Sequence, residues 1–161
     1  MTRYRKVPGL SVIAQDILLR REFPGFTRKT RSDTLAVWDG PLQIAESGRA
    51  YTVSIQLRPG ESPRVRVVSP CPLPLHPGEK CLPHIYYGGY LCLYEGSRQW
   101  NPSRPVTDIV CWTSEWLAFY EIWLVTGNWK GGGRHPESPP ARRIRRARKS
   151  KASRRKDIAV L

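Results

Sequence analysis

The 161-residue sequence lacks several patterns by which common classes of protein are recognised. Its longest apolar stretch, residues 116–125, is interrupted by Glu121 and is far too short to cross a bilayer. The basic first residues are followed by no apolar run of signal-peptide length, so we expect a cytoplasmic protein without membrane contact. No glycine-rich nucleotide motif is present, and we therefore expect any ATP-dependent activation to be performed by a separate enzyme.

The sequence also lacks the paired cysteine spacing of a structural zinc site. Its four cysteines, Cys71, Cys81, Cys92 and Cys111, form no Cys-x-x-Cys motif, and the nearby histidines complete no common zinc pattern. We therefore expect no metal and no cofactor. Without a secretory signal, a disulfide framework is not expected either. Cys71 and Cys111 are interpreted as small buried hydrophobic residues, which leaves Cys92 as the exception.

Acidic side chains are scarce: 13 Asp and Glu stand against 27 Lys and Arg, a formal net charge of +14. The imbalance is greatest in residues 141–161, which contain ten Lys and Arg and a single acidic residue, Asp157. Such a block of like charge repels itself and favours disorder. We therefore divide the chain into a folded domain, 1–136, and a basic, disordered tail, 137–161. The tail is either a solvated segment or a contact for an anionic surface, such as nucleic acid or an acidic protein face.

Two helices are predicted from the spacing of apolar residues. Such residues recur three and four positions apart over residues 10–23 and again over residues 106–124. The first helix is expected to end at Pro24-Gly25 and the second at Thr126-Gly127-Asn128. The first run is marked by Leu10, Ile13 and Ile17. The second has a wide apolar stripe, typical of a helix buried against a sheet: Ile109, Trp112, Trp116, Tyr120 and Trp123.

Between the helices the sequence predicts an antiparallel meander. Strands are expected at residues 34–38, 51–57 and 64–68, the last two showing the alternation of a half-buried strand. The first strand is expected to end in a turn at residues 39–41, Asp-Gly-Pro. Residues 70–83 contain five prolines and predict a long loop outside any helix or sheet. This order of elements predicts an α+β fold.

Cys92 closes a distinctive segment, Pro83-His84-Ile85-Tyr86-Tyr87-Gly88-Gly89-Tyr90-Leu91-Cys92-Leu93. Trp100-Asn101-Pro102-Ser103 follows, starting eight residues after the cysteine. A thiol just past a glycine turn is well placed for presentation as a nucleophile. By periodicity alone, a cysteine between two leucines is more typical of a buried small residue than of a presented nucleophile.

The segment resembles the active site of the ubiquitin-conjugating enzyme family. That family's pattern reads His-Pro-Asn-Ile-Tyr, two residues, Gly, one residue, an aliphatic residue, the catalytic Cys, Leu, and a Trp-x-Pro starting eight residues past the Cys. The residues in register are Pro83, Ile85, Tyr86, Gly89, Leu91, Cys92, Leu93, Trp100 and Pro102. Leu82 and His84 depart from it, because the family usually has His and Asn there. Gly40-Pro41 and Arg58-Pro59-Gly60 also resemble family turns, so the likeness extends over about residues 10–129 and implies the UBC-like fold.

The resemblance implies a transferase that accepts a protein C-terminus as a thioester on Cys92 and passes it to the amine of a target lysine. His84 then stands where the family has an Asn that supports the loop and the oxyanion. Its imidazole either donates a hydrogen bond to the oxyanion or only caps the loop backbone. Family members often place a carboxylate a little over thirty residues past the cysteine. Residues 124–128 contain none, which leaves Asn128 and His135 as candidates.

With these departures from the family pattern, the sequence is similar to the bacterial stand-alone conjugating enzymes of short type II CBASS antiphage operons. That likeness implies as partner a cGAS-like nucleotidyltransferase, whose C-terminus plays the part of ubiquitin, or else a ubiquitin-like protein. Two other functions stay open. The chain is alternatively a non-catalytic binding module on the same fold, or a nucleic-acid-binding protein driven by its basic tail.

Overall fold

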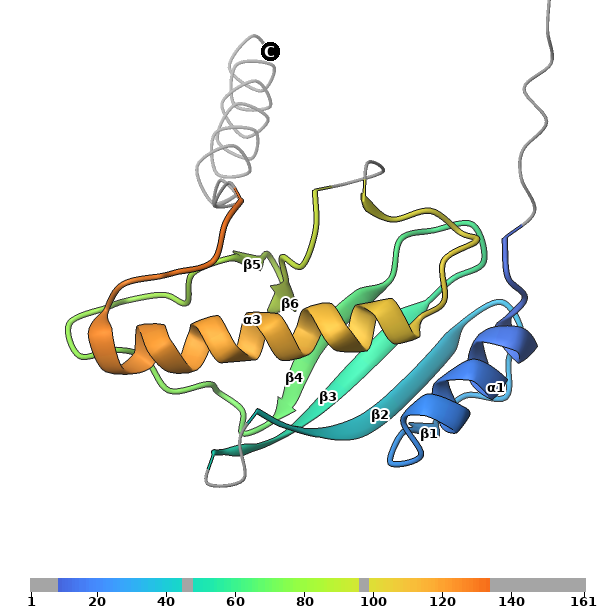
Figure 1. Ribbon diagram of the computed structural model, residues 1–161, viewed down its shortest axis with the longest axis horizontal. Helices are drawn as coiled ribbons and strands as arrows, with labels where there is room; N and C mark the ends of the chain where they lie inside the picture. The colour runs from blue at the N-terminus through green and yellow to red at the C-terminus, as the bar shows by residue number, and fades with distance from the viewer. Residues whose placement is uncertain (1–8, 45–47, 96–98, 134–161) are drawn as a thin grey trace, which may run out of the picture.

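A computed structural model describes residues 9–44, 48–95 and 99–133 of the chain (Figure 1). Within these ranges two helices accompany a four-stranded antiparallel sheet of order β1-β2-β3-β4 and a small hairpin, β5-β6. The α+β prediction is therefore confirmed. The elements are α1 (Val12–Glu22), β1 (Thr27–Arg28), β2 (Ala36–Gln43), β3 (Ala50–Leu57), β4 (Arg64–Ser69), β5 (Ile85–Tyr86), β6 (Tyr90–Leu91) and α3 (Thr107–Thr126). The predicted tail, 137–161, lies outside the described residues.

Helix α1 begins where the Ser11 side chain accepts a hydrogen bond from the amide of Ala14, at 3.2 Å. The predicted helix is confirmed, but its apolar spacing indicated the wrong buried face. Ile13 and Ile17 are 59% and 60% exposed, while four other residues of the helix face inward. These are Val12, Gln15, Asp16 and Leu19.

The inward polar residues of α1 are buried because distant partners satisfy them. The Asp16 carboxylate accepts from Trp38 Nε1 at 2.7 Å and pairs with Arg20. Burial raises the pKa of Asp16, and hydrogen bonds from Arg20 and Trp38 outweigh this, so that the pKa is lowered overall. The Gln15 side chain accepts from the amide of Val106 at 2.6 Å, which ties α1 to the start of α3. Satisfied polar groups can thus occupy a helix face that apolar spacing alone does not identify.

Strand β2 is longer than predicted, and the turn expected at residues 39–41 is wrong, because these residues pair with β3 inside the sheet. Gly40 is needed for close packing: a Cβ there would lie 2.3 Å from the ring of Phe26. Pro41 is tolerated because β1 pairs with β2 only before this point, so that β2 is an edge strand at the proline.

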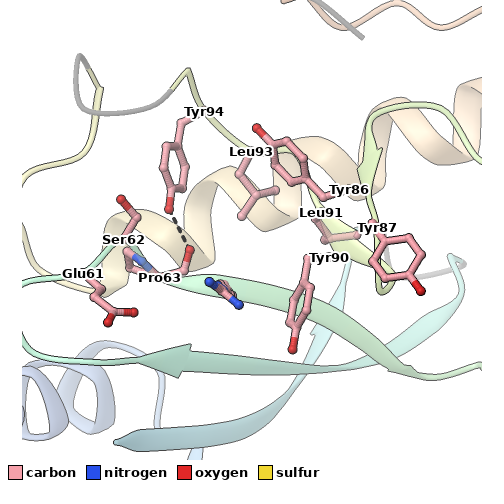
Figure 2. A pocket seen from close by; sticks show the side chains of 10 residues that line it. Glu61, Ser62, Pro63, Tyr86, Tyr87, Tyr90, Leu91, Leu93 and Tyr94 are labelled. Carbon is pink, nitrogen blue, oxygen red and sulfur yellow. Dashed lines mark hydrogen bonds between the residues drawn. The ribbon is translucent and has the colours of Figure 1, made fainter. Parts of the chain in front are cut away.

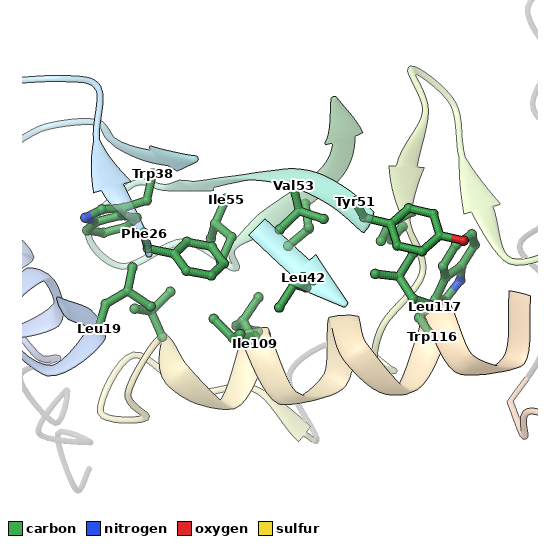
Figure 3. Close-up of a cluster of buried hydrophobic side chains, with 14 of the residues drawn as sticks. Leu19, Phe26, Trp38, Leu42, Tyr51, Val53, Ile55, Ile109, Trp116 and Leu117 are labelled. Carbon is green, nitrogen blue, oxygen red and sulfur yellow. The ribbon is translucent and has the colours of Figure 1, made fainter. Parts of the chain in front are cut away.

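The core lies between the sheet and α3 (Figure 3). The predicted alternation of β3 is confirmed, with Tyr51, Val53, Ile55 and Leu57 all buried. Helix α3 fills the other side with the predicted stripe, of which Trp112 alone is only partly buried. Gly127 ends the helix with a left-handed φ of 72°, in the predicted Thr126-Gly127-Asn128 segment.

The proline-rich loop, residues 70–83, contains no helix or strand, as predicted. It packs along the second half of α3. Tyr120 donates to the carbonyl of Pro74 at 2.8 Å, and His76 Nδ1 lies 3.1 Å from the carbonyl oxygen of Leu124. The loop therefore enters the cysteine segment from a fixed direction, set by α3.

The burial predicted for two cysteines is wrong, because Cys71 and Cys111 are both exposed, as is Cys81. Cys111 belongs to α3, but its side chain lies on the face opposite the buried stripe. In the sequence it stands between Ile109 and Thr113, which both face inward. Cys71 lies in the proline-rich loop, which contributes Leu73 to the core but leaves Cys71 itself exposed.

Neither helix in the described part of the chain is long and apolar enough to span a bilayer. Among the same residues, no group of three or more potential metal ligands comes together.

Candidate active site

A two-stranded hairpin positions Cys92. Strands β5 and β6 pair antiparallel, and the chain reverses between them through Gly88 and Gly89, whose φ values of 88° and 77° favour glycine. The first residue after β6 is Cys92, and its amide donates to the carbonyl of His84 at 2.8 Å. The hairpin therefore brings the two predicted site residues together, directly across from each other.

His84 is held on several sides. His84 is buried, with 8% of its surface exposed, and its backbone is in the left-handed region with a φ of 49°. Its carbonyl accepts a second hydrogen bond, from Trp116 Nε1 of α3 at 3.2 Å. The imidazole stacks on the indole of Trp129, with ring centroids 4.8 Å apart and an interplanar angle of 18°. One residue thus connects the nucleophile loop to the buried helix and to the segment after it.

The sulfur of Cys92 contacts the hydroxyl of Tyr86 in β5. The thiol donates to that oxygen at 3.3 Å, and the residue is partly exposed. The hydrogen bond with Cys92 and the burial of the phenol together raise the pKa of Tyr86 to about 12. Tyr86 therefore keeps its proton at neutral pH, and its O–H can donate a hydrogen bond to the sulfur once the thiol has lost its own proton.

Replacing Tyr86 by Phe is expected to reduce the reactivity of Cys92. A hydrogen bond to an anion is stabilising, and Tyr86 is partly exposed, so solvent screens much of this contribution; we expect about two- to fivefold slower alkylation near pH 7.5. The measurement is iodoacetamide modification of Cys92 followed by mass spectrometry. Tyr87→Phe is the matched control, because that side chain is 73% exposed in the hairpin turn and should leave the rate unchanged. Equal rates for Tyr86→Phe and the wild type would contradict the assignment.

A pocket of about 120 Å³ opens beside the sulfur. We call it the cysteine pocket. Its walls come from the hairpin, from α3 and from the segment after α3, and they include His84, Cys92, Glu115, Trp116, Phe119 and Trp129. A carboxylate beside a thiol can attract an ammonium ion and accept its proton.

The sequence interpretation missed Glu115 and Trp129 as residues of the site. Glu115 follows Trp112 by one helical turn, and that spacing was the available signal. The proposed alternative Asn128 does not line the cysteine pocket, and its side chain donates to the carbonyl of Thr126 at the helix end, at 3.2 Å. His135 lies outside the described residues.

A second, larger hollow of about 440 Å³ is lined by the hairpin and by residues 61–64, at the start of β4 (Figure 2). We call it the tyrosine groove, after Tyr86, Tyr87, Tyr90 and Tyr94, which line it together with Arg64. The Tyr94 hydroxyl donates to the carbonyl of Pro63 at 2.6 Å, and the Arg64 guanidinium lies 5.8 Å from the centre of the Tyr90 ring. Tyr86 thus lines this groove and also contacts the sulfur of Cys92.

An α+β domain that presents a cysteine after a glycine-turn hairpin, with a buried helix behind it, is consistent with the class of E2-like conjugating proteins. Comparison with protein families gives the more particular assignment. The family described as type II CBASS E2 protein matches residues 15–136, and the chain belongs to this family. Its role is therefore conjugating-enzyme-like, within a bacterial CBASS antiviral defence system. No curated protein matches the chain.

Proposed function

We propose that this protein carries the C-terminal acyl group of a partner protein as a thioester on Cys92 and transfers it to a lysine amine. The observation that supports this most directly is the position of the sulfur. It is partly exposed, lines the cysteine pocket, and contacts Tyr86, which lines the tyrosine groove. The partner we propose is a cGAS-like nucleotidyltransferase, activated by a separate enzyme before it reaches Cys92.

Two substrates must meet at the sulfur, and the two hollows differ in a way that suits them. The tyrosine groove, with a volume of about 440 Å³, has room for the last residues of a polypeptide, and Tyr86 in its wall contacts Cys92. The cysteine pocket is small, with a carboxylate and several aromatic rings, which is chemistry that attracts an alkylammonium group. In this scheme the partner's C-terminus enters by the groove and the lysine by the pocket.

The proposal is tested by looking for the covalent intermediate. The protein is co-expressed with the candidate nucleotidyltransferase and its activating enzyme, and intact mass is measured without reductant. We expect an adduct equal to the partner less one water, located at Cys92 and released by a small thiol, because thiols exchange with thioesters. No adduct on Cys92 under these conditions would overturn the proposal and favour a binding module.

We propose that His84 is a positioning residue, since its carbonyl holds the Cys92 amide and its ring braces Trp129. Because an imidazole ordinarily titrates near neutral pH, transfer from Cys92 is expected to depend on pH between about 6 and 7. His84→Asn should fold, since Asn tolerates a positive φ, and should still form the thioester while flattening this dependence. The measurement is the single-turnover transfer rate across that range. A pH profile that is unchanged in His84→Asn would contradict this role of the His84 imidazole.

A further inference from the structure

Trp129 has a buried indole N–H with no acceptor among the described residues, and its side chain lines the cysteine pocket. Buried donors are nearly always paired in folded proteins, so an exception beside a nucleophile points to a group that arrives with the substrate. Transfer from a thioester creates such a group, because the carbonyl oxygen becomes an anion in the tetrahedral intermediate.

The indole is held rigidly by its neighbours. It stacks on His84, and its centroid lies 5.5 Å from that of Trp116 and 5.8 Å from that of Phe119. Two of these rings belong to α3, and the third belongs to the residue whose carbonyl accepts the Cys92 amide. The direction of the N–H is therefore set by the same contacts that place the sulfur, which is the preorganisation that an oxyanion site requires.

We propose that the Nε1–H of Trp129 donates a hydrogen bond to the carbonyl oxygen of the acyl group on Cys92, an inference that rests on the proposed function. The lysine nitrogen attacks the thioester carbon, a C–N bond forms, and the carbonyl π electrons move to oxygen, which accepts from Trp129. Collapse of the intermediate restores the C=O bond and breaks the C–S bond. The sulfur leaves as thiolate, and the proton lost from nitrogen goes to water.

The glycines that follow Trp129 fit this role. A Cβ on Gly131 would lie 2.6 Å from Trp129 Nε1 and 2.8 Å from Phe119 Cδ2, so the backbone passes close over the indole nitrogen. A Cβ on Gly132 would meet nothing within 4 Å. A side chain at 131 would therefore press on the indole nitrogen and disturb its approach to the acyl oxygen.

The decisive variant is Trp129→Phe, which keeps an aromatic ring on His84 and removes the N–H. Its control is Trp100→Phe, because the Trp100 indole N–H is also buried without an acceptor among the described residues, but does not line the cysteine pocket. Cys92 is loaded with a synthetic peptide thioester by thiol exchange, and transfer to free lysine is followed in single turnover. Removing one neutral oxyanion donor typically slows catalysis by about 10²–10³-fold, and we expect a loss of about this size.

The expected result is a slower maximal rate in Trp129→Phe at an unchanged half-saturating lysine concentration, and a rate within about twofold of wild type in Trp100→Phe. Gly131→Ala should also slow transfer, while Lys130→Ala, a change at an exposed residue that does not line the pocket, should not. This pair keeps the test decisive if Trp129→Phe folds poorly. Wild-type transfer by Trp129→Phe, or equal loss in Gly131→Ala and Lys130→Ala, overturns the inference and leaves the thioester mechanism standing. Failure of wild-type Cys92 to accept the peptide overturns the proposed function itself.

Discussion

Cys92→Ala is expected to abolish acyl transfer without unfolding the domain. In the proposed mechanism the acyl group is bonded to this sulfur, and no other described residue is proposed to carry it. The change removes a single sulfur atom from a partly exposed position outside the buried core, and its effect on stability should be small beside that of a core truncation. Conjugates are measured on non-reducing gels and by intact mass after co-expression with the partner and its activating enzyme.

Cys92→Ser provides the complementary result. Serine offers an oxygen nucleophile, and an oxygen ester transfers to amines far more slowly than a thioester. We therefore expect this variant to accumulate an adduct with the partner's C-terminus that survives reductant. The matched controls are Cys71→Ala, Cys81→Ala and Cys111→Ala, three exposed thiols that should all retain conjugation. Conjugates formed by Cys92→Ala, or an acyl group found on Cys81, would show that the mechanism is wrong.

Trp116→Ala is expected to have the largest effect on stability, about 3–5 kcal/mol in the free energy of unfolding. Trp116 is 3% exposed and stacks on Tyr120, with ring centroids 5.6 Å apart and an interplanar angle of 7°. Its truncation opens a cavity between α3 and the hairpin and removes the donor to the His84 carbonyl. Because domains are stable by only about 5–15 kcal/mol, this loss is a large fraction of the total.

The effect is measured by urea denaturation, with Ile122→Ala as the control on the same helix. Ile122 is 42% exposed, so its truncation should cost well under 1 kcal/mol. Trp116→Phe separates packing from hydrogen bonding, because it retains a ring but loses the bond to His84. If Trp116→Ala lowers the free energy of unfolding by no more than Ile122→Ala does, the helix does not support the nucleophile loop in the way described.

Periodicity was sufficient to predict most of the secondary structure. The strand Ala50–Leu57 and the helix Thr107–Thr126 were anticipated because inward residues recur at the two- and three-to-four-residue spacings that backbone geometry imposes. The error at residues 39–41 arose because glycine and proline were interpreted as a turn. Gly40 instead makes room for Phe26, a contact that depends on tertiary packing and not on local conformation.

By itself, the sequence determined the α+β order of elements and the glycine turn before Cys92, because these depend on residues within a few positions of each other. Tertiary structure alone decided which polar groups of α1 are buried, since Asp16 is satisfied by Trp38, 22 residues away. It also decided that Glu115 and Trp129 share a pocket with Cys92. The physical reason is that Glu115 and Trp129 come close to the hairpin only once α3 has packed across the sheet. The spacing of residues along the chain does not encode this contact.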